Sequence, residues 1–150
     1  MTTEMRAARL HKPGEPLRVD RIAVPEPGPR DVLIEVKSCG VIPNMNAIFS
    51  GALWNRLPQL PASVGLDAAG VVAKVGAAVT NVAVGARVYV NPWLNCGTCV
   101  YCRAGAPLQC SGAAFQGYFG FTDQSAPLLR ACPYGDFAEY MASACSTFRC

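Results

Sequence analysis

The chain has 150 residues, 51% of them hydrophobic, and a formal net charge of +3 at pH 7. This length suffices for one domain with a hydrophobic core, and no apolar stretch reaches the length of a membrane span. The basic residues are scattered without a stripe or aromatic interleaving, which argues against nucleic acid as a partner. The only histidine is His11, which limits general-base and metal chemistry.

The chain begins without an apolar segment of the kind found in signal peptides. Residues 1–6 are polar or charged apart from two methionines. This composition predicts a cytoplasmic protein, in which cysteines stay reduced or bind metal rather than forming disulfides.

Most predicted elements are strands separated by turns rich in Gly and Pro. Along the segment 31–37, Val32, Ile34 and Val36 share one face. Glu35 and Lys37 share the other face, which is the period of a strand. The predicted strands are 6–11, 17–24, 31–37, 70–76, 87–90 and 137–141, and a short helix is predicted at 44–49. With 14 Gly and 12 Pro spread along the chain, we expect a barrel-like β domain with irregular connections.

A dense cysteine array follows the fifth predicted strand. Cys96, Cys99, Cys102 and Cys110 form the pattern C-x2-C-x2-C-x7-C. Four thiolates complete the tetrahedral shell of a structural zinc ion, and the two-residue gaps let one tight loop direct consecutive sulfurs at one ion. Because all four positions are filled by protein, this zinc would hold structure together and take no part in catalysis.

Three other states of these cysteines fit the sequence less well than a zinc site. Free thiols would leave the concentration of four cysteines within fifteen residues unexplained. Disulfides need an oxidising compartment, which the N-terminus does not indicate. A bacterial iron–sulfur motif has a shorter last gap followed by Pro, whereas Ser111 follows here. We therefore favour one structural zinc ion per chain.

Several further stretches carry a family resemblance. They are residues 5–8 and 25–34, the run Cys39-Gly40-Val41, residues 70–76 with 84–88, the cysteine array, and residues 137–140. Over about residues 5–140 the chain resembles the N-terminal, GroES-like domain of medium-chain dehydrogenases/reductases, the superfamily of zinc alcohol dehydrogenases and quinone oxidoreductases. The resemblance implies a mainly β fold, a GroES-like contorted β-barrel with short helices and a structural-zinc lobe at about 95–111.

The sequence departs from this family where the catalytic zinc would bind. A Cys-His pair follows the Gly-Val in zinc-dependent members, but Ile42 and Pro43 stand here. The Gly-His-Glu motif, which gives the second ligand, contains Leu66 followed by Asp67. Ile and Leu have no lone pair to donate, so we expect the catalytic zinc ligands to be missing.

The same positions are similar to the zinc-independent branch of the family. Pro43-Asn44 resembles the Asn-Pro loop of quinone oxidoreductases, and residues 65–70 are similar to their Gly-x-Asp-x-x-Gly strand. The resemblance makes Asn44 and Asp67 the candidate catalytic residues. Asn44 could instead cap the short helix, and Asp67 could pair with an arginine.

Other candidates have simpler interpretations. We expect Cys39 to be a small core residue rather than a nucleophile. A catalytic zinc rebuilt from Cys39, Asp67 and Cys132 has no support in their spacing. The remaining candidates are aromatic residues that could line an apolar cleft or belong to the core: Phe49, Trp54, Tyr118 and Phe119.

Members of this family continue into a Rossmann domain that binds NAD(P). No G-x-G-x-x-G motif occurs here, so we expect residues 1–150 to form the substrate-side domain alone, without the cofactor domain and inactive by itself. In a full enzyme the resemblance implies NAD(P) as cofactor and a small-molecule carbonyl or alkene as substrate, with no membrane partner, and it admits a homo-oligomer. The alternative is a catalytically inactive, zinc-stabilised β module or a truncated remnant.

Overall fold

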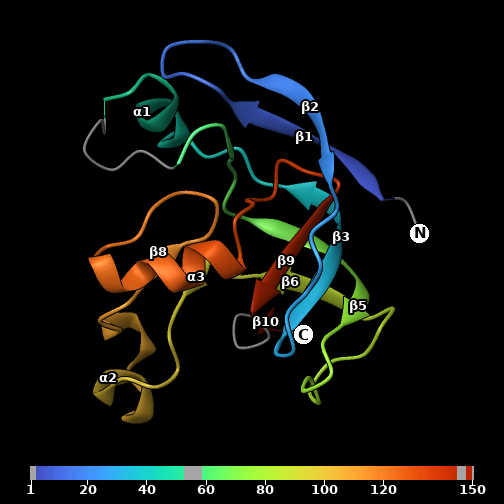
Figure 1. Cartoon of the computed structure of the whole chain (residues 1–150), viewed down its shortest axis with the longest axis vertical. Coiled ribbons are helices and arrows are strands. Elements are labelled where there is room, and N and C mark those ends of the chain that lie inside the picture. Colours follow the sequence, from blue (N-terminus) through green and yellow to red (C-terminus); the bar gives the residue numbers. More distant parts are fainter. Residues whose placement is uncertain (1–2, 53–58, 145–147, 150) are drawn as a thin grey trace.

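The computed structural model describes residues 3–52, 59–144 and 148–149, and its strands form three sheets (Figure 1). The first sheet has the order β2-β1-β4, the second β10-β6-β5-β3-β9, and the third is the pair β7-β8. The strands are β1 (Glu4–Leu10), β2 (Arg18–Ala23), β3 (Asp31–Cys39), β4 (Ala62–Ser63), β5 (Ala68–Val75), β6 (Arg87–Val90), β7 (Trp93–Leu94), β8 (Ala114–Phe115), β9 (Tyr140–Ala144) and β10 (Phe148–Arg149). The prediction of a mainly β domain is confirmed.

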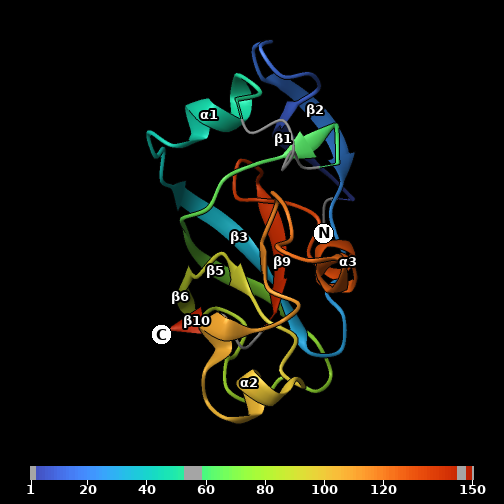
Figure 2. The ribbon, with the colours of Figure 1, turned by 90° about the vertical axis from the view of Figure 1, so that its left-hand side faces the viewer.

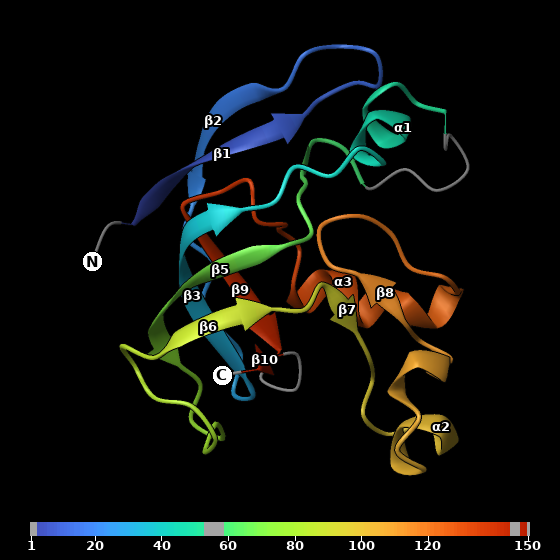
Figure 3. The ribbon, with the colours of Figure 1, turned by 180° about the vertical axis from the view of Figure 1, so that it is seen from behind.

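The helices are few and short. They are α1 (Met45–Phe49), α2 (Val100–Arg103), α3 (Ala126–Ala131) and the 3-10 turns η2 (Pro107–Gln109) and η3 (Asp123–Ser125). No helix in the described ranges is long and apolar enough to cross a membrane. The β1–β2 hairpin and α1 lie at one end of the molecule, and α2 lies at the other (Figures 1 and 2). Figure 3 shows α3 beside β7 and β8.

The strand β3 organises the five-stranded sheet because it pairs antiparallel with β5 on one side and β9 on the other. Cys39, its last residue, lies opposite Ala68 at the start of β5, and Glu35 lies opposite Tyr140 at the start of β9. The loop after β3 and the segments before β5 and β9 therefore come together at one end of the sheet (Figure 3).

The core of this sheet follows the predicted pattern. Val32 and Ile34 are fully buried, and Val36 packs against the same cluster. Their partners come from the neighbouring strands: Ala68, Val72, Val88, Val90 and Met141. Leu33 is buried as well, so the strict alternation of one buried and one exposed face does not hold at that position.

The last predicted strand, at 137–141, was placed about three residues too early. The main chain at Phe137 and Glu139 first bonds β1, through Ala8 N–H to Phe137 O (2.7 Å) and Glu139 N–H to Arg6 O (3.1 Å). Glu139 O also accepts from Val36 N–H of β3 (2.9 Å), and the paired register with β3 runs from Tyr140, opposite Glu35. The chain thus changes partners in this segment, which an apolar pattern does not reveal. The helix α3 was not predicted.

The turn between β5 and β6 packs closely against the segment before β3. A Cβ atom built on Gly76 would lie 2.1 Å from the Gly28 carbonyl oxygen and 2.5 Å from that of Pro29. Gly76 also donates a backbone hydrogen bond to Asp31 O (2.9 Å). The close approach of two backbones leaves no room for a side chain here.

We predict that Gly76→Ala lowers the free energy of unfolding by about 3 kcal/mol, because the backbone must shift to relieve the clash. The matched control is Gly85→Ala, which meets nothing within 4 Å but has a φ of +88°. Its cost should be only about 1 kcal/mol of backbone strain. Chemical denaturation of both variants measures the difference, and equal losses would contradict the packing argument.

Candidate metal centre and cleft

The structure brings the four cysteines of the array together at the α2 end of the molecule. Cys96 follows β7, Cys99 caps the N-terminus of α2, Cys102 lies within α2, and Cys110 ends the 3-10 turn η2. Their four sulfur atoms all lie within 4.8 Å of one another. Tetrahedral zinc with Zn–S bonds of about 2.3 Å needs sulfurs about 3.8 Å apart, so the cluster fits a zinc ion.

Backbone amides point at these sulfurs. The N–H of Cys99 lies 3.4 Å from Cys96 Sγ, that of Cys102 lies 3.5 Å from Cys99 Sγ, and that of Cys96 lies 3.3 Å from Cys110 Sγ. Hydrogen bonds from the backbone of Cys102 and Ser111 lower the pKa of Cys99 to about 6. Such bonds favour the thiolate, which is the form that binds metal.

The cluster cannot ionise fully by itself. Burial, followed by hydrogen bonds with Cys99 and Cys110, raises the pKa of Cys102 to about 12. The sulfurs of Cys96 and Cys110 are only 3.5 Å apart, a distance at which two thiolates repel each other strongly. A divalent cation would remove this repulsion, so the donor set suits zinc and leaves no ligand position open for substrate.

Little apolar burial supports the zinc lobe, the segment 95–111. Its larger apolar side chains, Val100, Tyr101 and Leu108, are exposed, and Cys110 is its only buried residue. The fold of this segment therefore depends on what the sulfurs bind.

We predict that Cys99→Ser disorders the zinc lobe while the β-barrel stays folded, because one lost ligand breaks the closed site and the barrel core lies elsewhere. Amide hydrogen exchange should increase at residues 95–111 and stay unchanged in β3 and β5. Cys39→Ser, which alters an exposed cysteine outside the cluster, is the control. Global unfolding of Cys99→Ser would show that the barrel needs the lobe.

The two predicted catalytic residues lie at the end of the sheet where β3 ends and β5 begins. Asn44 occupies the N-cap position of α1, but its side chain makes no capping hydrogen bond and is exposed. Asp67 is half-buried, and its Oδ1 accepts a hydrogen bond from the Tyr89 hydroxyl at 2.7 Å. Among the described residues Asp67 forms no ion pair. Its partner is therefore a tyrosine and not the arginine of the alternative interpretation.

Apolar side chains stand at the two positions where the sequence resemblance led us to expect lost zinc ligands. Ile42 is half-buried in the loop after β3. Leu66 packs against a second core cluster that contains Leu10, Ile48 and Val64. Neither side chain can bind a metal ion.

Two expectations about cysteines change. Cys39 is exposed at the end of β3, so the expectation of a core residue was wrong; the strand extends two residues beyond its predicted end and carries Cys39 out of the core. Cys132 is buried with Leu94 and Ala114 in a separate cluster. The four cysteines of the zinc lobe are the only metal-competent group in the described part of the chain, so a zinc rebuilt from Cys39, Asp67 and Cys132 has no support.

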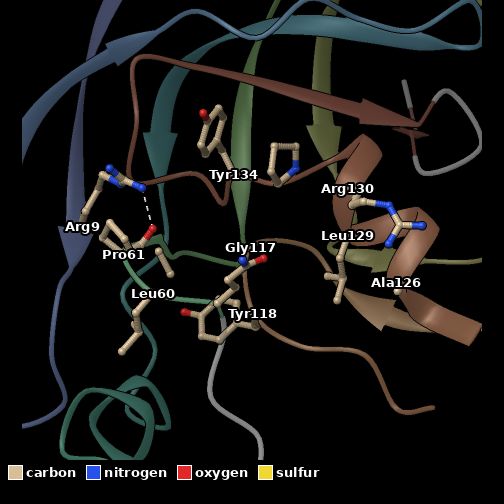
Figure 4. Close-up of a pocket in the computed structure, with 12 residues that line it drawn as sticks. Arg9, Leu60, Pro61, Gly117, Tyr118, Ala126, Leu129, Arg130 and Tyr134 are labelled. Carbon is tan, nitrogen blue, oxygen red and sulfur yellow. Dashed lines mark hydrogen bonds between the residues drawn. The ribbon is translucent and has the colours of Figure 1, made fainter. Parts of the chain in front are cut away.

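The expected cleft aromatics have different surroundings. Tyr118 is buried and belongs to the second core cluster, and Phe49 and Phe119 pack against that cluster. Tyr118 also borders a cavity of about 570 Å³ (Figure 4). Trp54 lies outside the described residues.

Sequence reasoning missed an unusual carboxylate beside Asp67. Asp136 is only 1% exposed, and neither of its carboxylate oxygens meets a partner at good hydrogen-bond geometry. The backbone N–H groups of Asp136 and Asp67 stabilise its charge only weakly, less than burial opposes it. It packs on Gly65, where an added Cβ would lie 1.5 Å from Asp136 Oδ1. Burial, with a smaller contribution from the charge of Asp67, raises the pKa of Asp136 to about 7. The only signal in the sequence is an acidic residue directly before an aromatic strand-like run.

We predict that Asp136 makes the domain lose stability as the pH rises. Because its folded-state pKa is raised from 3.8, the folded protein binds the proton more tightly, and stability present below pH 4 is lost as the pH rises through about 7. Asp136→Asn should be more stable than the parent at pH 8, by on the order of 3 kcal/mol, and should gain little at pH 4. Unfolding midpoints at both pH values test this. Glu4→Gln, an exposed acid, is the control, and an equal gain at pH 4 would contradict the assignment.

Together, the β-barrel, the closed four-cysteine lobe and the sheet end lined by Asn44 and Asp67 define a zinc-stapled domain of the dehydrogenase type. Comparison with known proteins agrees, because the family described as "Alcohol dehydrogenase GroES-like domain" matches residues 28–147. The chain belongs to this family, and the GroES-like fold expected from the sequence is confirmed.

Curated relatives give the same result. An NAD-dependent alcohol dehydrogenase of Sulfolobus acidocaldarius is 36% identical over 117 residues, which cover 75% of this chain and 34% of that protein. The trans-enoyl reductase tazE of Aspergillus terreus is 51% identical over 80 residues, 53% of this chain and 26% of that protein. The chain therefore spans about a third or less of the length of these relatives.

Solved structures show the same fold. The cobalt- and zinc-bound thermostable alcohol dehydrogenase of Pyrobaculum aerophilum superposes with a TM-score of 0.79 at 32% identity, covering 97% of this chain and 40% of that one. The alcohol dehydrogenase of Aeropyrum pernix gives a TM-score of 0.81 at 28% identity, with 96% and 39% covered.

Proposed function

We propose that this chain is the substrate-side domain of an NAD(P)-dependent oxidoreductase, of the alcohol dehydrogenase and quinone reductase type, that keeps the structural zinc and lacks the catalytic zinc. The observation that carries the proposal is the pair of apolar side chains, Ile42 and Leu66, which stand where the family resemblance expects metal ligands and cannot bind a metal ion. In this proposal residues 1–150 form one domain, with the zinc lobe at about 95–111.

The substrate class follows from what related proteins act on. The Sulfolobus relative is an alcohol dehydrogenase, and the Aspergillus relative, which has the higher identity, is a trans-enoyl reductase. These names support a small-molecule carbonyl or activated alkene as substrate. Because no G-x-G-x-x-G motif occurs in these 150 residues, the nicotinamide cofactor binds outside them in this proposal.

The chain's own residues would act through hydrogen bonds rather than through a metal. When bound, a nicotinamide cofactor supplies hydride chemistry. The exposed amide of Asn44 can donate a hydrogen bond to a substrate oxygen. Asp67, held by the Tyr89 hydroxyl, can accept a hydrogen bond and fix the orientation of its neighbours. Fixed donors of this kind stabilise charge that develops on a substrate oxygen.

The zinc content of the purified chain tests the proposal. We predict one zinc ion per chain by native mass spectrometry, lost from the Cys99→Ser variant because its four-sulfur site is broken. In the whole protein, NAD(P)H-dependent turnover should survive a chelator mild enough to leave the zinc lobe loaded. A second zinc ion, or loss of turnover under these conditions, would mean that a catalytic metal exists after all.

A further inference from the structure

A cavity of about 570 Å³ opens where the segment before β4 and the α3 region face each other (Figure 4). Its volume falls in the range of small-molecule sites, about 300–1,000 Å³. Leu60, Pro61 and Leu129 give it an apolar wall. Two arginines, Arg9 and Arg130, also line it, and none of the described lining residues is acidic. The cavity is therefore apolar over most of its surface and positive where it is charged.

Arg9 is held in position but keeps unused donors. Its Nη2 donates to the Pro61 carbonyl oxygen at 2.5 Å, and its Nη1 lies 3.4 Å from Asp20 Oδ2. The same Asp20 oxygen is 2.7 Å from His11 Nε2, so the carboxylate is shared between two partners. A guanidinium has five N–H donors, and each terminal nitrogen of Arg9 has one left after these contacts. Arg9 is thus a fixed cation whose charge is only partly compensated.

Arg130 supplies the second positive charge from the last turn of α3. It is exposed, and within the described ranges it has neither an ion pair nor a side-chain hydrogen bond. Figure 4 shows Arg9 and Arg130 on opposite sides of the cavity, with Tyr118 and Tyr134 between them. The two charges therefore flank the cavity and make its potential positive.

Tyr118 adds an aromatic ring to the cavity lining. Its ring is buried, and its hydroxyl oxygen accepts a hydrogen bond from the Gly65 N–H at 3.1 Å. Tyr118 therefore gives the cavity an aromatic lining residue that is fixed in place by its bond to Gly65.

We propose that this cavity binds an organic carboxylate: a small acid with an apolar body against Leu60, Pro61 and Leu129 and its carboxylate on Arg9. The charge of Arg130 attracts the acid to the cavity without needing to touch it. A bare inorganic anion would leave the apolar wall in water, and a neutral molecule would form only weaker hydrogen bonds with Arg9, without the charge that strengthens them. The proposal rests on the lining of the cavity and not on the catalytic assignment above.

The test uses two nearly isosteric probes, phenylacetate and phenylacetamide, which differ in charge. Both are titrated into the zinc-loaded, 15N-labelled chain, and the shifts of backbone amides give each Kd. We expect phenylacetate to bind at least fivefold more tightly, with shifts at Tyr118 and Leu129. Added salt should weaken the binding of phenylacetate and leave the binding of phenylacetamide unchanged.

Substitutions locate the binding group. Arg9→Gln should weaken the binding of phenylacetate about tenfold, because it removes a direct contact. Arg130→Gln should weaken it about threefold, because it removes a nearby charge. Arg87→Gln is the matched control, because it removes an exposed charge from β6, outside the cavity. Phenylacetamide should be unaffected by Arg130→Gln.

Three results would overturn the proposal: equal Kd values for the two probes, equal effects of Arg130→Gln and Arg87→Gln, or no saturable shift at Tyr118 and Leu129. Arg9→Gln could fail to fold because Arg9 also bonds the Pro61 carbonyl oxygen. In that case the comparison of phenylacetate with phenylacetamide and the Arg130→Gln variant still test the proposal.

Discussion

The pairing of β3 with both β5 and β9 is the constraint on which the rest of the domain depends. It buries Val32 and Ile34 in the main core and fixes where three connecting segments meet. Because the strands are antiparallel, the end of β3 lies beside the beginnings of β5 and β9. The loop carrying Ile42, the residues before Ala68 and the turn carrying Asp136 are therefore held at one edge of the sheet.

The domain is stabilised in two physically different ways. The barrel relies on apolar burial shared among long-range strand pairs, whereas the zinc lobe relies on four sulfurs contributed by one short segment. The lobe contacts the barrel through the β7–β8 pair, where Trp93 Nε1 donates to Pro107 O at 3.2 Å and the Trp93 ring packs edge-on against Phe115. This arrangement separates the four-cysteine cluster from the candidate cleft, so the lobe does not depend on the residues that line the cleft.

The polar groups near the sheet edge are less completely satisfied than the core. Asp67 has a hydrogen-bonded tyrosine, while Asp136 is buried beside it without a well-aligned partner for either oxygen. Such a group costs stability unless it is protonated, and groups of this kind concentrate at functional sites. The cavity flanked by Arg9 and Arg130 has the opposite charge, so the domain presents two distinct electrostatic environments on one small scaffold.

Features that depend on residues close together in the chain could be predicted from the sequence. The spacing of the cysteines predicted the four zinc ligands, because one tight loop can direct them at one ion. The alternation of apolar and polar residues predicted β3, because side chains on a strand change face at every residue. The prediction that Ile42 and Leu66 replace zinc ligands rests on the family resemblance and stays a prediction. The rest required the three-dimensional structure: the burial of Asp136 on Gly65, the exposure of Cys39, the start of β9 at Tyr140, and the position of Arg9 across a cavity from α3. These features join segments far apart in the chain, and no local pattern encodes which distant backbone a residue will meet.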